Sequence, residues 1–214
     1  MADIFEEVDE DLKQDNAKKL WDQYGRYIIG VATAVILATA GNVGWREYVQ
    51  DRQESYSERF ITAISLAGDK KHSEAAAVLA ELSQDASGGY GTLARFREAV
   101  ERVAAGETAA AIDIYDAIAD DSGTDTLYRG LAVLNSVILQ IDTGDAAALK
   151  SRVGPLMASD HPWRHSATET FAVLALQAGD LDEARKTYQQ LADDLEAPQG
   201  ARSRATEMLR TFGE

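Results

Sequence analysis

Histidines are the first side chains in this 214-residue chain to consider for chemistry, because it has three of them and no cysteine. His161 and His165 are four residues apart, and Glu169 follows four residues later. On one helix these side chains would share a face and could hold a metal ion. Pro162, however, is typical of a first helical turn, which leaves His161 at the cap and favours solvent-exposed imidazoles over a metal site.

The rest of the sequence gives no indication of catalysis. His72 stands alone in an expected turn between charged residues, which predicts an exposed side chain. The chain has no glycine-rich phosphate loop after a strand and no Gly-x-Ser-x-Gly motif. Its carboxylates are accounted for as helix caps and solvated faces. We therefore expect no enzyme activity, cofactor, metal ion or small-molecule substrate.

The composition favours helices and a strongly acidic surface. The chain has 36 acidic and 21 basic side chains, which gives a net charge of −15. This charge repels phosphate backbones and anionic headgroups, so nucleic-acid binding and peripheral membrane adhesion are both disfavoured. Proline is scarce, at 3 residues, and alternating β-branched runs are few. The sequence thus predicts an all-α fold.

One apolar stretch organises the chain. Residues 27–45 contain no charged side chain, and as a helix they cover roughly 28 Å, close to the hydrocarbon thickness of a bilayer. Tyrosine and arginine precede the stretch at Tyr24 and Arg26, and Trp45 and Arg46 mark its other end. Such residues settle at membrane interfaces. This pattern predicts a transmembrane helix.

Two other interpretations of the stretch are less consistent with its surroundings. A buried core helix usually keeps a polar stripe with charged side chains, which this stretch lacks. A cleaved signal peptide is suggested by Ala38-Thr39-Ala40, a small-x-small site. Residues 1–26, however, carry a net charge of −4 and are long, whereas a secretory n-region is short and basic. We therefore expect an uncleaved anchor.

The anchor has a face of small residues and a weak orientation signal. Gly30, Ala34, Ala38 and Gly41 fall on one helical face, which favours close packing against a partner helix, although a lone anchor is also compatible with it. Four Lys and Arg residues lie within about 15 residues before the anchor and three lie after it. This bias predicts a cytoplasmic N-terminus and, in a bacterium, a periplasmic C-terminal domain.

The part after the anchor is repetitive. Four glycine-acid pairs, spaced by 38, 38 and 35 residues, each precede an alanine-rich amphipathic segment: Gly68-Asp69, Gly106-Glu107, Gly144-Asp145 and Gly179-Asp180. A left-handed glycine ends one helix, the acid caps the next, and alanines permit close packing. The period predicts tetratricopeptide-like helical hairpins that stack into a solenoid. We expect hairpins over residues 47–84, 90–120, 125–158 and 162–195, and a capping helix over 199–212.

These patterns divide the chain into a short acidic tail over 1–24, a transmembrane helix over 25–46 and a repeat domain over 47–214. Irregularities are expected where Lys70 and Lys71 lengthen the first turn and where Gly154-Pro155 shortens a helix. Four tyrosines are expected to pack against alanines in the core: Tyr90, Tyr115, Tyr128 and Tyr188. The first helix of each hairpin would line a groove for protein partners, for which the candidates are Tyr90, Arg97, Tyr128 and Asn135.

Several segments resemble the YfgM-like family of ancillary subunits of the bacterial Sec translocon. They are the tail MADIFEEVDEDLKQD, the anchor flanks WDQYGRYIIGV and GWREY, and the late segments HPWRHSATETFAVLALQAGDLDEARKTYQQL and APQGARSRATEML. The resemblance implies a single-pass inner-membrane protein whose periplasmic repeats contact the SecYEG channel and periplasmic chaperones, so that emerging polypeptides are passed on. An adaptor for cell-envelope or division machinery is the alternative.

Overall fold

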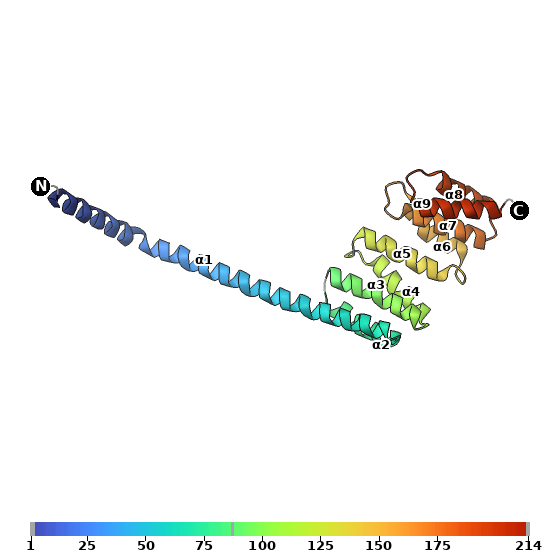
Figure 1. Ribbon diagram of the computed structural model, residues 1–214, viewed down its shortest axis with the longest axis horizontal. Helices are drawn as coiled ribbons and strands as arrows, with labels where there is room; N and C mark the ends of the chain where they lie inside the picture. Colours follow the sequence, from blue (N-terminus) through green and yellow to red (C-terminus); the bar gives the residue numbers. More distant parts are fainter. Residues whose placement is uncertain (1–2, 87, 213–214) are drawn as a thin grey trace. The chain divides into compact units, whose positions relative to one another are not determined.

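The computed structural model describes residues 3–86 and 88–212, with side chains for 18–86 and 88–212, and Figure 1 shows its helices. Within these residues every regular element is a helix and no strand occurs. The chain divides into two compact units, one up to Ser55 and one from Tyr56 onward. The expected all-α fold is confirmed.

The helices follow one another with short turns. They are α1 (Asp3–Gly68), α2 (His72–Asp85), α3 (Gly89–Ala104), α4 (Thr108–Asp120), α5 (Thr126–Gln140), α6 (Ala146–Val153), the 3-10 helix η1 (Gly154–Met157), α7 (Arg164–Gln177), α8 (Leu181–Asp193) and α9 (Gln199–Thr211). The tail from Asp3 onward, the anchor and the first helix of the first hairpin, expected as separate segments, all belong to α1.

The first unit contains the apolar stretch. A segment within Lys18–Gly68 is long and apolar enough to cross a membrane, and none of it is buried against other described residues. Val31 and Leu37 are 65% and 67% exposed. A core helix would be enclosed, so this exposure is at odds with the core-helix interpretation. The hydroxyl of Thr39 donates to the carbonyl of Val35 (2.8 Å), which satisfies a polar group within the stretch.

The second unit is a row of helical hairpins. The last turns of α1 pair with α2, α3 with α4, α5 with α6, and α7 with α8, while α9 follows as a closing helix (Figure 1). The expected hairpin ranges agree with these bounds to within a few residues, except for the start of the first hairpin, because α1 has no boundary at residue 47 and the second unit begins at Tyr56. The helix before Gly154-Pro155 is short, as expected, since α6 ends at Val153 and continues as η1.

The turn chemistry follows the expected pattern at some repeats only. Gly106 (φ 82°) and Gly179 (φ 76°) adopt the left-handed conformation that ends a helix. Asp145 and Asp180 accept hydrogen bonds from backbone N–H groups of the next helix, as capping requires. Glu107 makes no capping bond and pairs with Arg102 instead (2.6 Å).

The other two glycines have different roles, so the left-handed prediction was wrong for them. In the lengthened first turn Lys70 takes the positive φ, 63°, in place of Gly68. Lys71 then precedes α2, so Asp69 is too early to cap it. Gly144 lies at a close approach, since a Cβ there would lie 3.0 Å from the carbonyl oxygen of Gln140 and 2.9 Å from Cδ1 of Leu149.

Among the residues that the structure describes, the hydrophobic core forms four clusters, each of which joins one hairpin to the first helix of the next or to α9. One cluster combines Ala99 of α3, Ile118 of α4 and Ala132 of α5, all fully buried. Another combines Tyr188 of α8 with Ala205 of α9. Tyr115 and Tyr188 are 4% and 2% exposed, so their predicted core role is confirmed, whereas Tyr128 is 47% exposed and the prediction was wrong for it. Alanines at the contacts allow the helices to approach closely.

The closing helix α9 covers the last hairpin. Its apolar side chains and that of Phe212, which follows it, all belong to the cluster with α7 and α8: Ala201, Ala205, Met208, Leu209 and Phe212. Arg204 and Arg210 lie on its exposed side. This is the capping role predicted for residues 199–212.

Replacing Leu174 with alanine tests the core. Leu174 is fully buried in the cluster between α5, α6 and α7, so Leu174→Ala should lower the free energy of unfolding by about 2–5 kcal/mol. Leu181 is 58% exposed, so Leu181→Ala should change the free energy of unfolding by no more than about 0.5 kcal/mol. The measurement is the urea concentration at the midpoint of helix loss, monitored by circular dichroism of the full chain in detergent. Equal midpoints for the two variants would contradict the packing described.

Candidate functional site

Exposed apolar side chains of the repeat unit gather on three helices. Nine large apolar side chains are exposed in residues 56–86 and 88–212. Two of them, Leu181 and Leu195, lie at the start of α8 and just after its end. The other seven lie on the last turns of α1, on α3 and on α5, and we call them the apolar face: Ile61, Ile64, Leu93, Val100, Leu127, Tyr128 and Ile138. Concentrations of this kind mark protein interaction surfaces more often than scattered apolar residues do.

Helical spacing explains why these side chains are exposed. In α3, Leu93, Arg97 and Val100 are four and three residues apart and share one side of the helix. The opposite side carries Gly91 and Glu98, which are buried against the neighbouring helices. α5 repeats the arrangement, with Tyr128, Asn135 and Ile138 on one side and the buried residues Gly130 and Val137 on the other.

Aromatic contacts hold the three helices of the apolar face next to one another. Tyr56 of α1 packs against Tyr90 of α3 with ring centroids 6.2 Å apart. Phe96 of α3 packs against Tyr128 of α5 at 6.3 Å and against Tyr115 of α4 at 5.8 Å. Tilted ring pairs at these distances are favourable. The face is therefore built on packed helices rather than on loops.

A polar contact fixes α3 to the turn that begins α5. Arg95 Nη2 donates to Asp121 Oδ2 (2.9 Å) and to the hydroxyl of Thr124 (3.1 Å), and the backbone N–H of Gly123 donates to Asp121 (2.9 Å). The hydrogen bond from Arg95 is the largest of the effects that hold the pKa of Asp121 below its ordinary value, followed by those from Gly123 and Thr124.

A buried carboxylate orients the one cation on the exposed side of α3. Glu101 is 2% exposed and lies 2.6 Å from Arg97 Nη2 and 2.7 Å from His72 Nδ1. Nδ1 of His72 is therefore within hydrogen-bonding distance of the Glu101 carboxylate. The prediction of an exposed, isolated His72 was wrong, since this half-buried ring reaches across from α2 to α3. The ion pair with Glu101 therefore holds the guanidinium of Arg97 in place.

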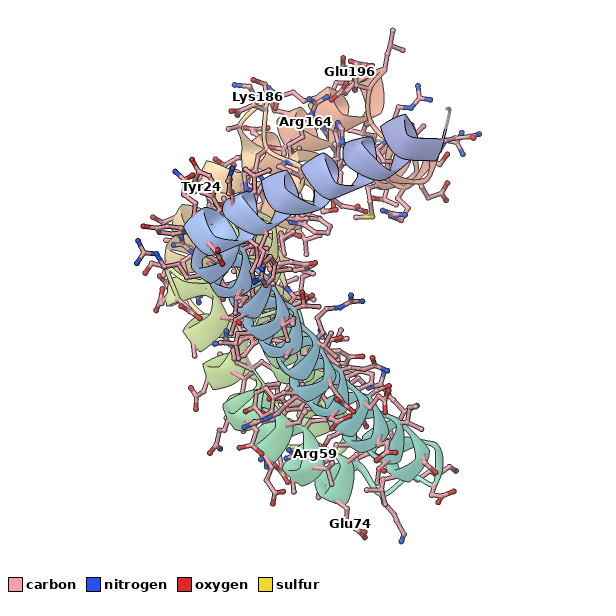
Figure 2. The ribbon with its side chains drawn as sticks, turned by 90° about the vertical axis from the view of Figure 1, so that its left-hand side faces the viewer. Tyr24, Arg59, Glu74, Arg164, Lys186 and Glu196 are labelled. Atoms are coloured by element: carbon pink, nitrogen blue, oxygen red, sulfur yellow. The ribbon has the colours of Figure 1, made fainter. Side chains whose placement is uncertain are left out.

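The same end of α3 holds a second buried acid. Glu98 is 8% exposed and accepts hydrogen bonds from Arg102, which also pairs with Glu107 (2.6 Å). Burial raises the pKa of Glu98, and Arg102 partly opposes the shift. Arg59 (labelled in Figure 2) pairs with Asp85 at 2.7 Å and so ties α1 to α2.

The four residues predicted to line a groove do not all share one surface. Arg97, Tyr128 and Asn135 lie on the exposed sides of α3 and α5, and Tyr128 is 47% exposed. Tyr90 instead packs against Tyr56 and the core cluster of α1, α2 and α3. Sequence reasoning missed Leu93, Val100 and Ile138, although their spacing from Arg97 and Asn135 was a usable signal. That these residues bind partners stays a prediction.

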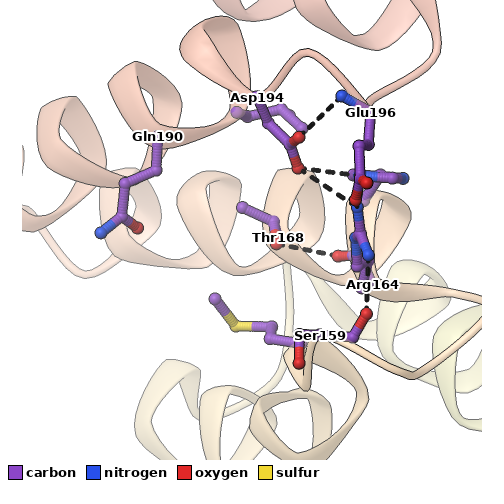
Figure 3. Close-up of a pocket in the computed structure, with 9 residues that line it drawn as sticks. Ser159, Arg164, Thr168, Gln190, Asp194 and Glu196 are labelled. Atoms are coloured by element: carbon purple, nitrogen blue, oxygen red, sulfur yellow. Dashed lines mark hydrogen bonds and ion pairs between the residues drawn. The ribbon is translucent and has the colours of Figure 1, made fainter.

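A separate cavity of about 340 Å³ lies between α7 and α8 (Figure 3). Arg164 reaches Glu196 (2.5 Å), Asp194 (3.7 Å) and the carbonyl of Ser159 (2.6 Å). Figure 2 shows Arg164 and Glu196 close together at this end of the repeat unit. These contacts pair the charges lining the cavity with one another and join α8 to α7.

The three residues considered for a metal ion have separate partners. His165 Nε2 lies 3.0 Å from Asp194, with its side chain 19% exposed, so the prediction of an exposed imidazole was wrong for it. His161 packs against Gly130 of α5, and Glu169 accepts two hydrogen bonds from Arg204 at 2.6 Å each. The helix α7 begins at Arg164, so His161 lies outside it rather than at its cap.

Comparison with known proteins agrees with this architecture. Residues 18–209 match the family model of the tetratricopeptide repeat-like domain. The chain belongs to this tetratricopeptide repeat-like family. A search of the curated proteins and a search of the solved structures each found no match to this chain. Repeat domains of this kind typically serve as non-catalytic protein-interaction modules, in which stacked helices present an extended binding surface.

Replacing Asp121 with asparagine tests the contact that joins α3 to α5. A carboxyl group whose pKa is lowered on folding stabilises the fold at pH values above its ordinary pKa of 3.8. This stabilisation is lost as the pH falls through the pKa of the folded state. Asp121→Asn should therefore melt below the wild-type protein at neutral pH, and the difference should shrink below pH 3.8. Thermal melts over a pH series measure it, with Asp113→Asn, an exposed acid on α4, as control. A difference independent of pH would contradict the assignment.

Proposed function

We propose that this protein is a membrane-anchored protein-interaction scaffold, and specifically an ancillary subunit of the Sec translocon that links emerging polypeptides to periplasmic chaperones. The observation that carries the scaffold proposal is the apolar face on α1, α3 and α5 of a tetratricopeptide repeat-like domain. The translocon and the chaperones come from the resemblance to the YfgM-like family.

The proposal assigns a membrane position to each part of the chain. Residues 1–24 form a cytoplasmic tail, 25–46 cross the bacterial inner membrane once, and 47–214 lie in the periplasm. The apolar stretch of α1 and the bias of Lys and Arg toward its N-terminal side support this orientation. A scaffold of this kind acts without a cofactor, since it works by holding proteins close to one another.

A helix partner inside the membrane belongs to the same proposal. Beyond its chain neighbours and the adjacent turns of its own helix backbone, a Cβ added to Gly30 or Gly41 would meet no described atom within 4 Å, so packing within the described chain does not require glycine there. Together with Ala34 and Ala38 these glycines form a small-residue face that suits close approach of another transmembrane helix. We assign this face to lateral packing against a membrane partner such as a translocon subunit.

Photo-crosslinking in cells tests the proposed function. A photoreactive residue in place of Val100, which is 45% exposed on the apolar face, should capture SecYEG subunits or periplasmic chaperones. The same residue in place of Lys186, which is exposed on α8, should capture them far less. Captured proteins are identified by mass spectrometry. Cell-envelope or division proteins captured at Val100 in place of these partners would favour the adaptor alternative and contradict the translocon assignment.

A further inference from the structure

The apolar face is bordered by carboxylates that no cation of the repeat unit neutralises. Glu58 precedes Ile61 by three residues in α1, and Asp125 precedes Tyr128 by three residues at the start of α5. Asp142 follows Ile138 by four residues, just after α5 ends. All three acids are exposed, and among the described side chains the ion pairs do not include them. Asp125 only accepts the N–H of Leu127 as a helix cap.

The nearby cations already have partners. Arg97, within the face, is held by Glu101 at 2.6 Å, Arg59 by Asp85 at 2.7 Å, and Arg95 by Asp121 at 2.9 Å. Their positive charge is therefore largely balanced by acids of the same repeat unit. Arg129, next to Tyr128 on α5, donates to the carbonyl of Ala119 (2.8 Å), and no ion pair among the described side chains includes it. The three exposed acids Glu58, Asp125 and Asp142 outnumber this cation, so the net uncompensated charge around the apolar face is negative.

From this combination we propose that the apolar face binds an amphipathic polypeptide segment that carries Lys or Arg next to its apolar side chains. This inference rests on the proposed function, because it takes the apolar face to be the protein-binding surface, and it specifies the chemistry of the bound segment. Apolar side chains of the segment cover Leu93, Val100 and Ile138, while its cations lie near the bordering carboxylates. Apolar anchors surrounded by complementary charge are typical of such interfaces.

The charge pattern also argues against other occupants of the face. A second copy of the chain meeting this face symmetrically would bring Glu58, Asp125 and Asp142 against the same acids, and like charges disfavour that contact. The chain's own N-terminal part, residues 1–26, has a net charge of −4 and is repelled for the same reason. An anionic lipid surface is repelled as well. A cationic segment is attracted, and more strongly at low salt.

Peptide binding to the full chain tests this proposal. The protein is placed in nanodiscs of neutral phosphatidylcholine, and binding is measured by fluorescence anisotropy against empty nanodiscs. The probe is a labelled Leu/Lys amphipathic peptide of about 16 residues, roughly 24 Å long as a helix. Its matched control has every Lys replaced by Glu. The Lys peptide should bind at least about tenfold more tightly than the Glu peptide, and the preference should fall as salt is raised.

Two pairs of variants locate the binding. The double variant Leu93→Ser with Val100→Ser removes two apolar side chains that are 50% and 45% exposed, and it should bind the Lys peptide about tenfold more weakly. Its control, Leu181→Ser on α8, should leave the affinity unchanged. Glu58→Gln with Asp142→Asn should weaken it about threefold. The matched double variant Asp113→Asn with Asp120→Asn removes the same charge from exposed positions on α4 and should leave binding unchanged.

The outcomes separate this proposal from the proposed function. Three results would each overturn the cationic-segment proposal. They are no binding of either peptide, binding of the Glu peptide that equals or exceeds that of the Lys peptide, and binding of the Lys peptide that the variants of the apolar face do not change. Translocon subunits or chaperones crosslinked at Val100 would still support the proposed function in those cases. Conversely, selective binding of the Lys peptide that depends on Leu93 and Val100 supports the proposed chemistry even if crosslinking in cells finds no translocon or chaperone.

Discussion

Burial of apolar surface between successive hairpins is the interaction on which the rest of the structure depends. A single pair of helices cannot enclose its own apolar side chains, so each hairpin needs the next one, and the last needs α9. The clusters show this directly, because Ala99, Ile118 and Ala132 come from α3, α4 and α5. Alanine at these contacts brings the helices close enough for dispersion attraction to act over long stretches of surface.

The same packing leaves apolar side chains exposed on one side of α3 and α5. Leu93, Val100 and Tyr128 are exposed because Ala94, Ala99 and Gly130 face the neighbouring helices. Ion pairs such as that of Arg95 with Asp121 fix the helices beneath the apolar face. A preorganised surface loses little conformational entropy when a partner binds, which suits a scaffold. The apolar stretch of α1 adds a membrane anchor to it in our proposal.

Local sequence patterns predicted the fold because helix ends and turns are determined by residues close together in the sequence. The period of Gly-acid pairs and the alanine-rich segments located the hairpins, and Gly154-Pro155 located the end of α6. Contacts between distant positions were not predictable in this way. His72 meets Glu101 across 29 residues, and Lys70 takes a left-handed conformation that its residue type does not announce. Arg97 was named as a groove candidate, which stays a prediction, and the exposed apolar residues near it in α3 emerge only when burial is known.

Hydrogen exchange of the full chain in neutral nanodiscs tests the stacking account most directly. Ile118 is fully buried in the cluster of α3, α4 and α5, so Ile118→Ala weakens one junction of the row. If stability is a sum of nearest-neighbour contacts, amides of α3, α4 and α5 should exchange much faster in the variant, and those of α8 and α9 should change little. An equal acceleration in every helix from α2 to α9 would contradict this account.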